Sequence, residues 1–276
     1  MSVLLLLAAA AAAAAAPVAD APAAKPQLDY GRLIDDAIDG GRIVQAESMF
    51  GQWRTESGQS DDGQVEIAAA RLALAKGQDV EAETRFASIS QAGSKDCRVD
   101  EGLGIARLRL GHRVEASEAL RRAVDHCPGR WRAWNALGVA YDAEKAWPLS
   151  AAAYEKAFQL TDKPVQVLNN YGLSMMAQGQ AEKAASIYAK ALELAPDDRR
   201  IISNADAAQV MAGRDISRRA DDDANSWAKR LGAAGQVALR MGDAIKARAY
   251  LSRAVTESES YQPEAAAALA SLGIKP

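Results

Sequence analysis

Trp131-Arg132-Ala133-Trp134-Asn135-Ala136-Leu137-Gly138-Val139-Ala140-Tyr141 is the stretch that decides the fold of this 276-residue chain. It opens one of five blocks that follow one another at intervals of 34 residues, beginning at Gly63, Cys97, Trp131, Val165 and Arg199. A fixed period of this length indicates a repeat protein, in which each unit packs only on its neighbours.

The spacing of Trp134, Leu137, Gly138 and Tyr141 resembles the W-x2-L-G-x2-Y signature of the tetratricopeptide (TPR) repeat, a helix-turn-helix unit of this length. The resemblance implies an all-α fold, a TPR α-solenoid. It also implies a non-enzymatic protein that binds other proteins.

Small and large residues recur in phase within the predicted helices. Each predicted second helix, apart from that of the unit after Arg199, pairs a small residue with a large one four positions on: Ala46 with Phe50, Ala82 with Phe86, Ala116 with Leu120, Ser150 with Tyr154, Ala184 with Tyr188, and Ala247 with Leu251. Four predicted first helices share a glycine at one register: Gly104, Gly138, Gly172 and Gly235. Since glycine inside a helix costs about 1 kcal/mol relative to alanine, we expect close helix contacts at these positions. Four further glycines are expected to end first helices in the left-handed conformation: Gly77, Gly111, Gly179 and Gly213.

The frame divides the chain into a leader with a Pro/Ala-rich linker and a solenoid of about seven repeats. The leader and linker cover 1–26, the repeats lie near 27–60, 63–96, 97–130, 131–164, 165–198, 199–227 and 228–261, and a capping helix covers 263–272. The unit over 199–227 is irregular, because Asp206 and Arg218 stand at the positions of small residues. We expect its second helix to be short or displaced, either by degeneration of the repeat or as a bend between two arms.

The beginning of the chain predicts export. An uncharged apolar run from Val3 to Ala16 suits the core of a signal peptide better than a membrane span, and prolines follow it. The run lacks lysine and arginine, so the alternative is an alanine-rich tail or a wrongly chosen start codon. We expect a periplasmic protein with no membrane span in the mature chain. The net charge of −3 gives no support for binding nucleic acid.

The two cysteines, Cys97 and Cys127, are expected to form a disulfide. Cys97 begins the first helix of its unit and Cys127 ends the second, and these ends are neighbours in an antiparallel hairpin. Two unlinked core thiols are the alternative. A zinc site is not expected, because His112 falls in the far turn, about 22 Å from Cys97 along the helix.

No catalytic or cofactor-binding residues are predicted. The two histidines leave little material for a catalytic triad or a metal hydrolase. The run from Gly102 to Arg107 lacks the third glycine and the preceding strand of a dinucleotide motif. We therefore expect no cofactor and no metal.

The candidate binding residues lie on the first helices, which form the concave surface of TPR proteins. The second positions of successive units form one row, Arg98, Arg132, Gln166 and Arg200, and the fifth positions form another, Glu101, Asn135, Asn169 and Ser203. The ninth positions give an apolar floor of Ile105, Val139, Leu173 and Ala207. Amides bind peptide backbone and arginines favour carboxylates, so we expect an extended or helical segment of a partner protein here. A merely solvated face is the alternative.

The repeats also resemble those of TadD-type proteins of the tight-adherence (Flp pilus) secretion system. Trp134 to Tyr141, Val167 to Ser174 and Ser203 to Arg214 carry this resemblance, which covers about residues 97 to 215. It implies an exported factor that helps to build the pilus apparatus, with pilus or secretin components as partners. TadD-type proteins are typically lipoproteins, whereas no cysteine lies near this leader to serve as a lipid-attachment site. We expect a soluble periplasmic form or attachment to the outer membrane through partners. The alternatives are a chaperone-like TPR protein of general envelope assembly and a cytosolic TPR co-chaperone.

Overall fold

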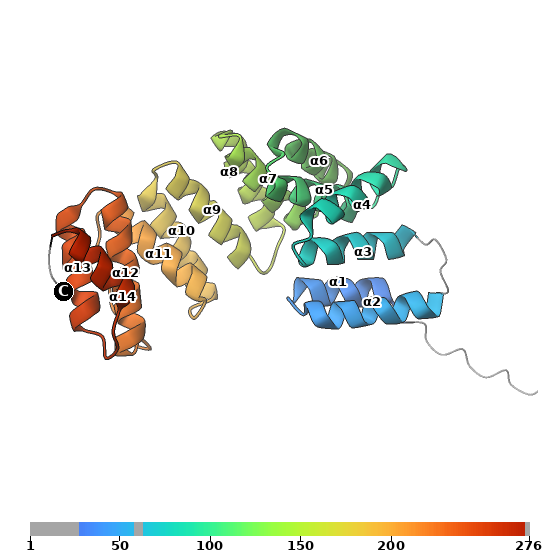
Figure 1. Ribbon diagram of the computed structural model, residues 1–276. Helices are drawn as coiled ribbons and strands as arrows, with labels where there is room; N and C mark the ends of the chain where they lie inside the picture. Colours follow the sequence, from blue (N-terminus) through green and yellow to red (C-terminus); the bar gives the residue numbers. More distant parts are fainter. Residues whose placement is uncertain (1–27, 58–62, 274–276) are drawn as a thin grey trace, which may run out of the picture.

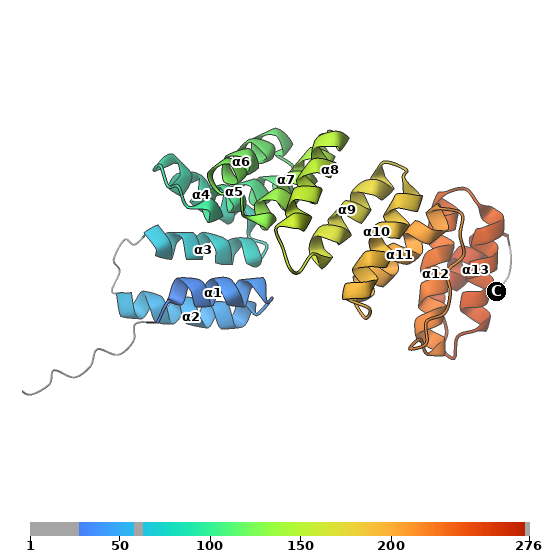
Figure 2. The ribbon, with the colours of Figure 1, turned by 180° about the vertical axis from the view of Figure 1, so that it is seen from behind.

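The computed structural model describes residues 28–57 and 63–273, so the predicted leader and linker lie outside the described residues. Within these ranges the chain forms fourteen α-helices and no strand. The helices are α1 Tyr30–Asp39, α2 Ile43–Ser57, α3 Gly63–Ala75, α4 Asp79–Gln91, α5 Cys97–Leu110, α6 Arg113–His126, α7 Trp131–Ala143, α8 Trp147–Gln159, α9 Val165–Ala177, α10 Ala181–Leu194, α11 Arg199–Met211, α12 Ala224–Arg240, α13 Ala244–Thr256 and α14 Pro263–Ser271. They stack along an arch that runs from α1 and α2 to α12, α13 and α14, mostly as antiparallel pairs, with α11 and α14 unpaired (Figures 1 and 2).

Glycine ends the first helices as predicted. Gly77, Gly111, Gly179 and Gly213 all have positive φ, between 71° and 85°. In the unit that begins at Trp131 the same position holds Lys145, whose φ of 59° places a side-chain-bearing residue in the left-handed region. The turn geometry is therefore kept even where the residue that favours it is missing.

The in-phase glycines lie at close helix contacts, which confirms that prediction. A Cβ atom on Gly138 would lie 2.6 Å from the Tyr154 ring, and one on Gly172 would lie 2.5 Å from the Tyr188 ring. Gly104 meets Leu120 and Gly235 meets Leu251 in the same way. Each large residue belongs to the second helix of the same unit and is fully buried. The small and large positions found in the sequence thus form the contact within each hairpin.

The irregular unit differs from its prediction, because it has no second helix. Residues 212–223 form turns and irregular chain, so Arg218 lies in no helix. Ile216 is buried and its backbone N–H donates to the Tyr250 hydroxyl at 3.3 Å. Lys246 Nζ donates to the carbonyls of Gly213 and Arg214. This segment therefore lies against α13, and α11 packs directly beside α12.

The last hairpin also begins earlier than the frame predicts. Helix α12 starts at Ala224, four residues before 228, where the Asp223 side chain accepts the Ser226 backbone N–H and caps the helix. Helix α14 packs on α12 and α13 at the end of the solenoid. None of the described helices combines the length and apolar character that a membrane span needs.

Candidate protein-binding groove

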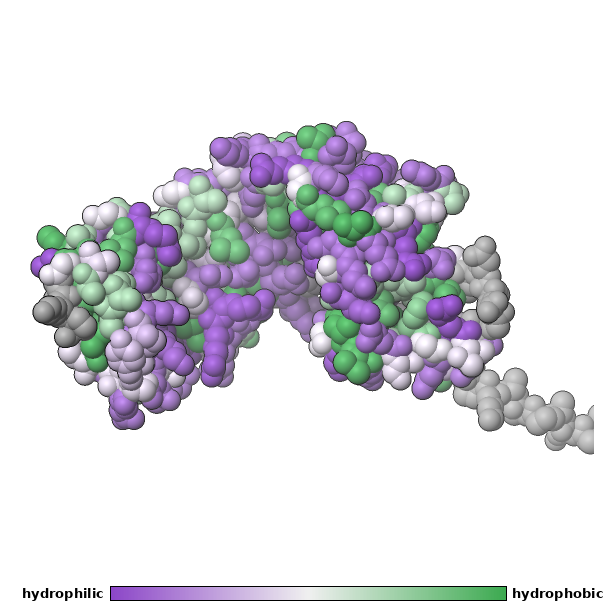
Figure 3. All heavy atoms as spheres, in the orientation of Figure 1, coloured by the Kyte–Doolittle hydropathy of each residue, from purple (hydrophilic) through white to green (hydrophobic). Residues whose placement is uncertain are grey.

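The first helices of successive units lie side by side, with α3 beside α5, α5 beside α7, α7 beside α9 and α9 beside α11. Together with α1 they border the hollow of the arch (Figure 3). The two predicted rows of polar residues stand on these helices. The structure therefore shows which members of the rows face the groove and which are buried or paired.

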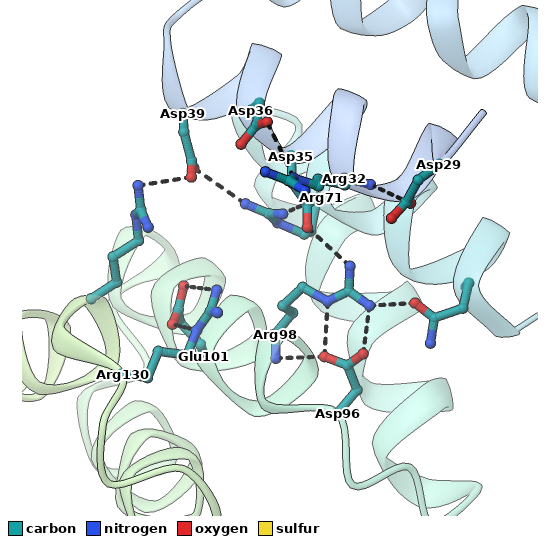
Figure 4. Close-up of polar contacts among 12 residues, drawn as sticks. Asp29, Arg32, Asp35, Asp36, Asp39, Arg71, Asp96, Arg98, Glu101 and Arg130 are labelled. Atoms are coloured by element: carbon teal, nitrogen blue, oxygen red, sulfur yellow. Dashed lines mark hydrogen bonds and ion pairs between the residues drawn. The ribbon is translucent and has the colours of Figure 1, made fainter. Parts of the chain in front are cut away.

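The first part of the groove is closed by ion pairs to α1 (Figure 4). Arg98 Nη1 contacts Asp35 Oδ2 at 2.9 Å, and Arg132 Nη2 contacts Asp39 Oδ2 at 2.8 Å. Arg71 lies between them and pairs with both aspartates. Two acidic side chains of one helix thus hold arginines from α3, α5 and α7, and the predicted binding residues Arg98 and Arg132 are engaged within the chain.

Arg71 is the most buried member of this cluster. The pKa of its guanidinium is lowered to about 10, chiefly by burial. The charges of Arg130, Arg98 and Arg132 act in the same direction, while Glu101 opposes the shift. Glu101 is itself buried and accepts from Arg130 Nη2 at 3.1 Å. Glu101 was expected to face a ligand; instead its buried carboxylate pairs with Arg130, because an unpaired carboxylate at this depth would be costly.

A chain of side-chain amides joins the middle helices. Asn170 Nδ2 donates to Asn135 Oδ1 at 3.2 Å, and Asn204 Nδ2 donates to Asn169 Oδ1 at 2.9 Å. Asn135 is only 5% exposed, and its hydrogen bond joins α7 to α9. The prediction that Asn135 faces a ligand is therefore wrong. Asn169 is half-buried.

The groove remains open from α7 onward. Val139 and Leu173, two members of the predicted apolar floor, are 36% and 43% exposed. Gln166 on α9 and Arg200 and Ser203 on α11 are exposed as well. Within the described residues Arg200 pairs only with Asp198, the N-cap of its own helix. This open part combines an apolar floor with polar edges.

A pocket of about 880 Å³ continues the open part between α11 and α12. Its apolar lining includes Ile202 and Ala207 from α11 and Ala233 and Val237 from α12. Charged residues from both helices and from the 212–223 segment surround this lining. Because the irregular unit lacks a second helix, α11 and α12 pack directly on each other, and residues of both line the pocket.

One wall of the pocket is built around Arg230. Its guanidinium contacts both oxygens of Asp206 at 2.7 Å and Asp222 Oδ2 at 2.5 Å. Burial raises the pKa of Asp206, and the hydrogen bonds from Arg230 oppose this shift. The arginine therefore keeps a buried pair of carboxylates neutralised.

The α12 side of the pocket was not predicted from the sequence. Lys229, Ala233 and Arg240 lie on one face of α12 at spacings of four and seven residues. That spacing could have indicated a common face of α12. It was missed because the predicted repeat began at 228, four residues after the observed start of the helix.

The two cysteines meet as the hairpin geometry predicts. Their Cα atoms are 6.1 Å apart, which is within the range of disulfides. Formation of the bond under oxidising conditions stays a prediction. Among residues 28–57 and 63–273, no group of three or more His, Cys, Asp and Glu side chains is placed to hold a metal ion.

Comparisons with known proteins agree with the repeat geometry. The family model of the tetratricopeptide repeat matches residues 165–198. Among solved structures, a thermophilic TPR protein of Thermus thermophilus superposes with a TM-score of 0.57 at 21% identity, covering 66% of this chain and 98% of that one. The Cut9–Hcn1 hetero-tetramer of APC/C superposes with a TM-score of 0.63 at 14% identity, covering 90% of this chain and 49% of that one.

The chain folds as a tetratricopeptide-repeat solenoid. TPR solenoids are scaffolds for protein interaction, so the groove is the surface on which a partner is to be sought. Two curated relatives are similar to this chain in sequence. The type IV pilus assembly protein PilF of Pseudomonas aeruginosa is 33% identical over 95 residues, which are 34% of this chain and 36% of that protein. Cellulose synthase operon protein C of Xanthomonas axonopodis pv. citri is 28% identical over 268 residues, which are 88% of this chain and 17% of that protein. The match thus spans about a third of the length of PilF and about a sixth of the length of cellulose synthase operon protein C.

Proposed function

We propose that this TPR solenoid is a non-enzymatic adaptor, exported to the periplasm, that assists assembly of a pilus or secretion system by binding a segment of a partner protein. The observation that carries the proposal is the exposed apolar floor of Val139 on α7 and Leu173 on α9, accompanied by the exposed polar side chains of Gln166 on α9 and Ser203 on α11. An apolar strip with polar edges on a helical face suits an extended or amphipathic segment.

The envelope context is supported by three features. The apolar run at the start of the chain is typical of a signal peptide, and residues 97 to 215 resemble TadD-type repeats. The similarity to a pilus assembly protein points to the same kind of task. Pilus or secretin components are therefore the proposed partners, and the protein is proposed to reach the outer membrane through them.

A second candidate function is a scaffold of general envelope assembly. The match to cellulose synthase operon protein C extends over 88% of this chain, much more than the match to PilF. The partner's identity separates the two candidates, since pilus or secretin proteins favour the first and other envelope proteins favour the second.

Affinity capture from the envelope fraction of cells that express the tagged protein tests the proposal. The groove variant Val139→Asp/Leu173→Asp should lose captured partner by about tenfold or more, because it places two charges on the apolar floor. The matched control Val80→Asp/Val114→Asp changes two exposed valines on the second helices α4 and α6 and should retain the partner.

Two results would overturn parts of the proposal. Equal capture by the groove variant and the wild type would refute the groove assignment. Protein with an intact Met1 found in the cytosolic fraction would refute export.

A further inference from the structure

We infer that the pocket between α11 and α12 takes an acidic segment of the partner protein. The inference rests on the proposed function and specifies the chemistry of the partner. It depends on which charges of the pocket are already paired, on how the same groove is occupied near α1, and on the spacing of the free charges.

Most acidic side chains of the pocket are held by its own arginines. Arg230 pairs with Asp206 and Asp222, and Arg219 contacts Asp221 at 3.2 Å and Asp197 at 3.7 Å. These two arginines thus engage four carboxylates within the chain.

The charges left free are mainly basic. In the described part of the chain Arg199, Lys229 and Arg240 make no hydrogen bond or ion pair through their side chains, and all three are exposed. Glu264 is the one acidic lining residue in the same condition among the described residues. The pocket as a whole is neutral, but its side chains that lack a partner among the described residues are three cations and one anion. Charge complementarity therefore favours an acidic ligand.

The chain itself shows how this groove binds acidic side chains. At the other end of the row of first helices, Asp35 and Asp39 of α1 engage arginines of α3, α5 and α7 (Figure 4). The carboxylates stand four residues apart, on one face of their helix. The α1 contact is an internal example of an acidic helix held by arginines of the first helices.

The geometry of the pocket suits a segment rather than a single side chain. Lys229 and Arg240 stand eleven residues apart on α12, about 16 Å at 1.5 Å per residue. Ala233 and Val237 lie between them as apolar lining, and Arg199 is on the opposite helix. A ligand that places carboxylates near the ends and a small apolar side chain between them fits this arrangement.

Two helical probe peptides of about 15 residues test the inference. Both carry the same face of leucine and alanine, and their polar faces carry glutamate in one and lysine in the other. Binding to the full chain is measured by fluorescence anisotropy at low and high salt. The glutamate peptide should bind at least about tenfold more tightly than the lysine peptide, and salt should reduce the difference.

Variants assign the binding to the pocket. The substitutions Arg199→Gln, Lys229→Gln and Arg240→Gln together should weaken binding of the glutamate peptide about tenfold or more. A matched control, Arg121→Gln with Lys156→Gln and Lys190→Gln, removes the same charge from exposed positions on the second helices α6, α8 and α10. The control should bind as the wild type does.

Three outcomes would overturn the inference. They are equal or tighter binding of the lysine peptide, unchanged binding by the pocket variant, and no binding of either peptide. Each leaves the adaptor proposal standing if Val139→Asp/Leu173→Asp still loses the captured partner. A separate result would refute the adaptor proposal: capture of the same amount of partner by this groove variant and by the wild type.

Discussion

Asp206 and Arg230 form a bidentate ion pair that joins α11 to α12, with Nε–Oδ2 and Nη2–Oδ1 distances of 2.7 Å. The same guanidinium contacts Asp222 and donates to the Ser217 carbonyl at 3.2 Å. Asp206 stands where four other units have the in-phase glycine. Because this unit lacks a second helix, α11, the 212–223 segment and α12 must be tied together in another way, and Arg230 contacts all three.

Replacement Arg230→Met should destabilise this end of the solenoid by about 3 kcal/mol. It leaves the carboxylates of Asp206 and Asp222, whose side chains are 12% and 8% exposed, without their cation. Urea unfolding followed by tryptophan fluorescence measures the change. Trp227 contributes to this signal, and the Arg230 guanidinium lies 5.4 Å from the centre of its ring. The control Arg240→Met changes an exposed arginine that is unpaired among the described residues, and it should stay within about 0.5 kcal/mol. Equal effects of the two variants would show that the Asp206–Arg230 pair contributes no more than a surface charge.

Replacement Gly138→Ala should destabilise the fourth unit by about 1 to 3 kcal/mol. The added Cβ atom would overlap the ring of Tyr154, which is buried and donates its hydroxyl hydrogen to Asp142 at 2.7 Å, so the ring cannot move without breaking that bond. Gly51→Ala is the control, because nothing lies within 4 Å of that position in α2. It should be neutral or stabilise by up to about 1 kcal/mol. Urea midpoints measure both, and a neutral Gly138→Ala would contradict the close-contact explanation of the in-phase glycines.

The repeat frame predicted from the sequence is correct where the contacts of a residue are formed within its own hairpin. The contact of Gly138 with Tyr154, and the left-handed turn at Gly111, are both formed within one 34-residue unit, so their pattern recurs along the chain. Hairpin closure also brings Cys97 and Cys127 together.

The frame fails where a position depends on another unit. Arg132 was placed correctly on a first helix, but its partner Asp39 lies in the first unit, and no local pattern connects them. Arg230 and Asp206 likewise belong to different units. Ion pairs between units determine which groove residues remain unpaired. These ion pairs depend on the curvature of the solenoid, so they cannot be predicted from the repeat pattern of the sequence.

Asp96 should make stability depend on pH between about 4 and 2. Burial alone would raise its pKa, but hydrogen bonds from the Arg98 side chain and backbone, with one from Gln64, outweigh it and lower the pKa from 3.8 to about 2. The folded state therefore binds a proton less readily than the unfolded chain. The resulting stability is complete above about pH 4 and is lost as the pH falls through 2.

The variant Asp96→Asn isolates this effect. Asparagine keeps the N-cap of α5, since its side-chain oxygen also accepts the Arg98 backbone N–H, but it carries no charge. Urea midpoints between pH 2 and 6 should fall less steeply in the variant, by less than about 1 kcal/mol because the site is partly solvated. Parallel curves for both proteins would show that Asp96 gives no pH-dependent stability.

The Cys97–Cys127 pair should stabilise the third unit once it is oxidised. The cysteines are separated by 30 residues, and closing a loop of this size in the unfolded chain is worth about 3 to 4 kcal/mol in the chain-entropy model. Alkylation of unreduced protein from the periplasm, followed by mass measurement, should find no free thiol. The double variant Cys97→Ala/Cys127→Ala should match the reduced wild type in its urea midpoint, and both should fall below the oxidised protein. Two alkylated cysteines in periplasmic protein would contradict the prediction, and with it the argument that this hairpin is adapted to an oxidising compartment.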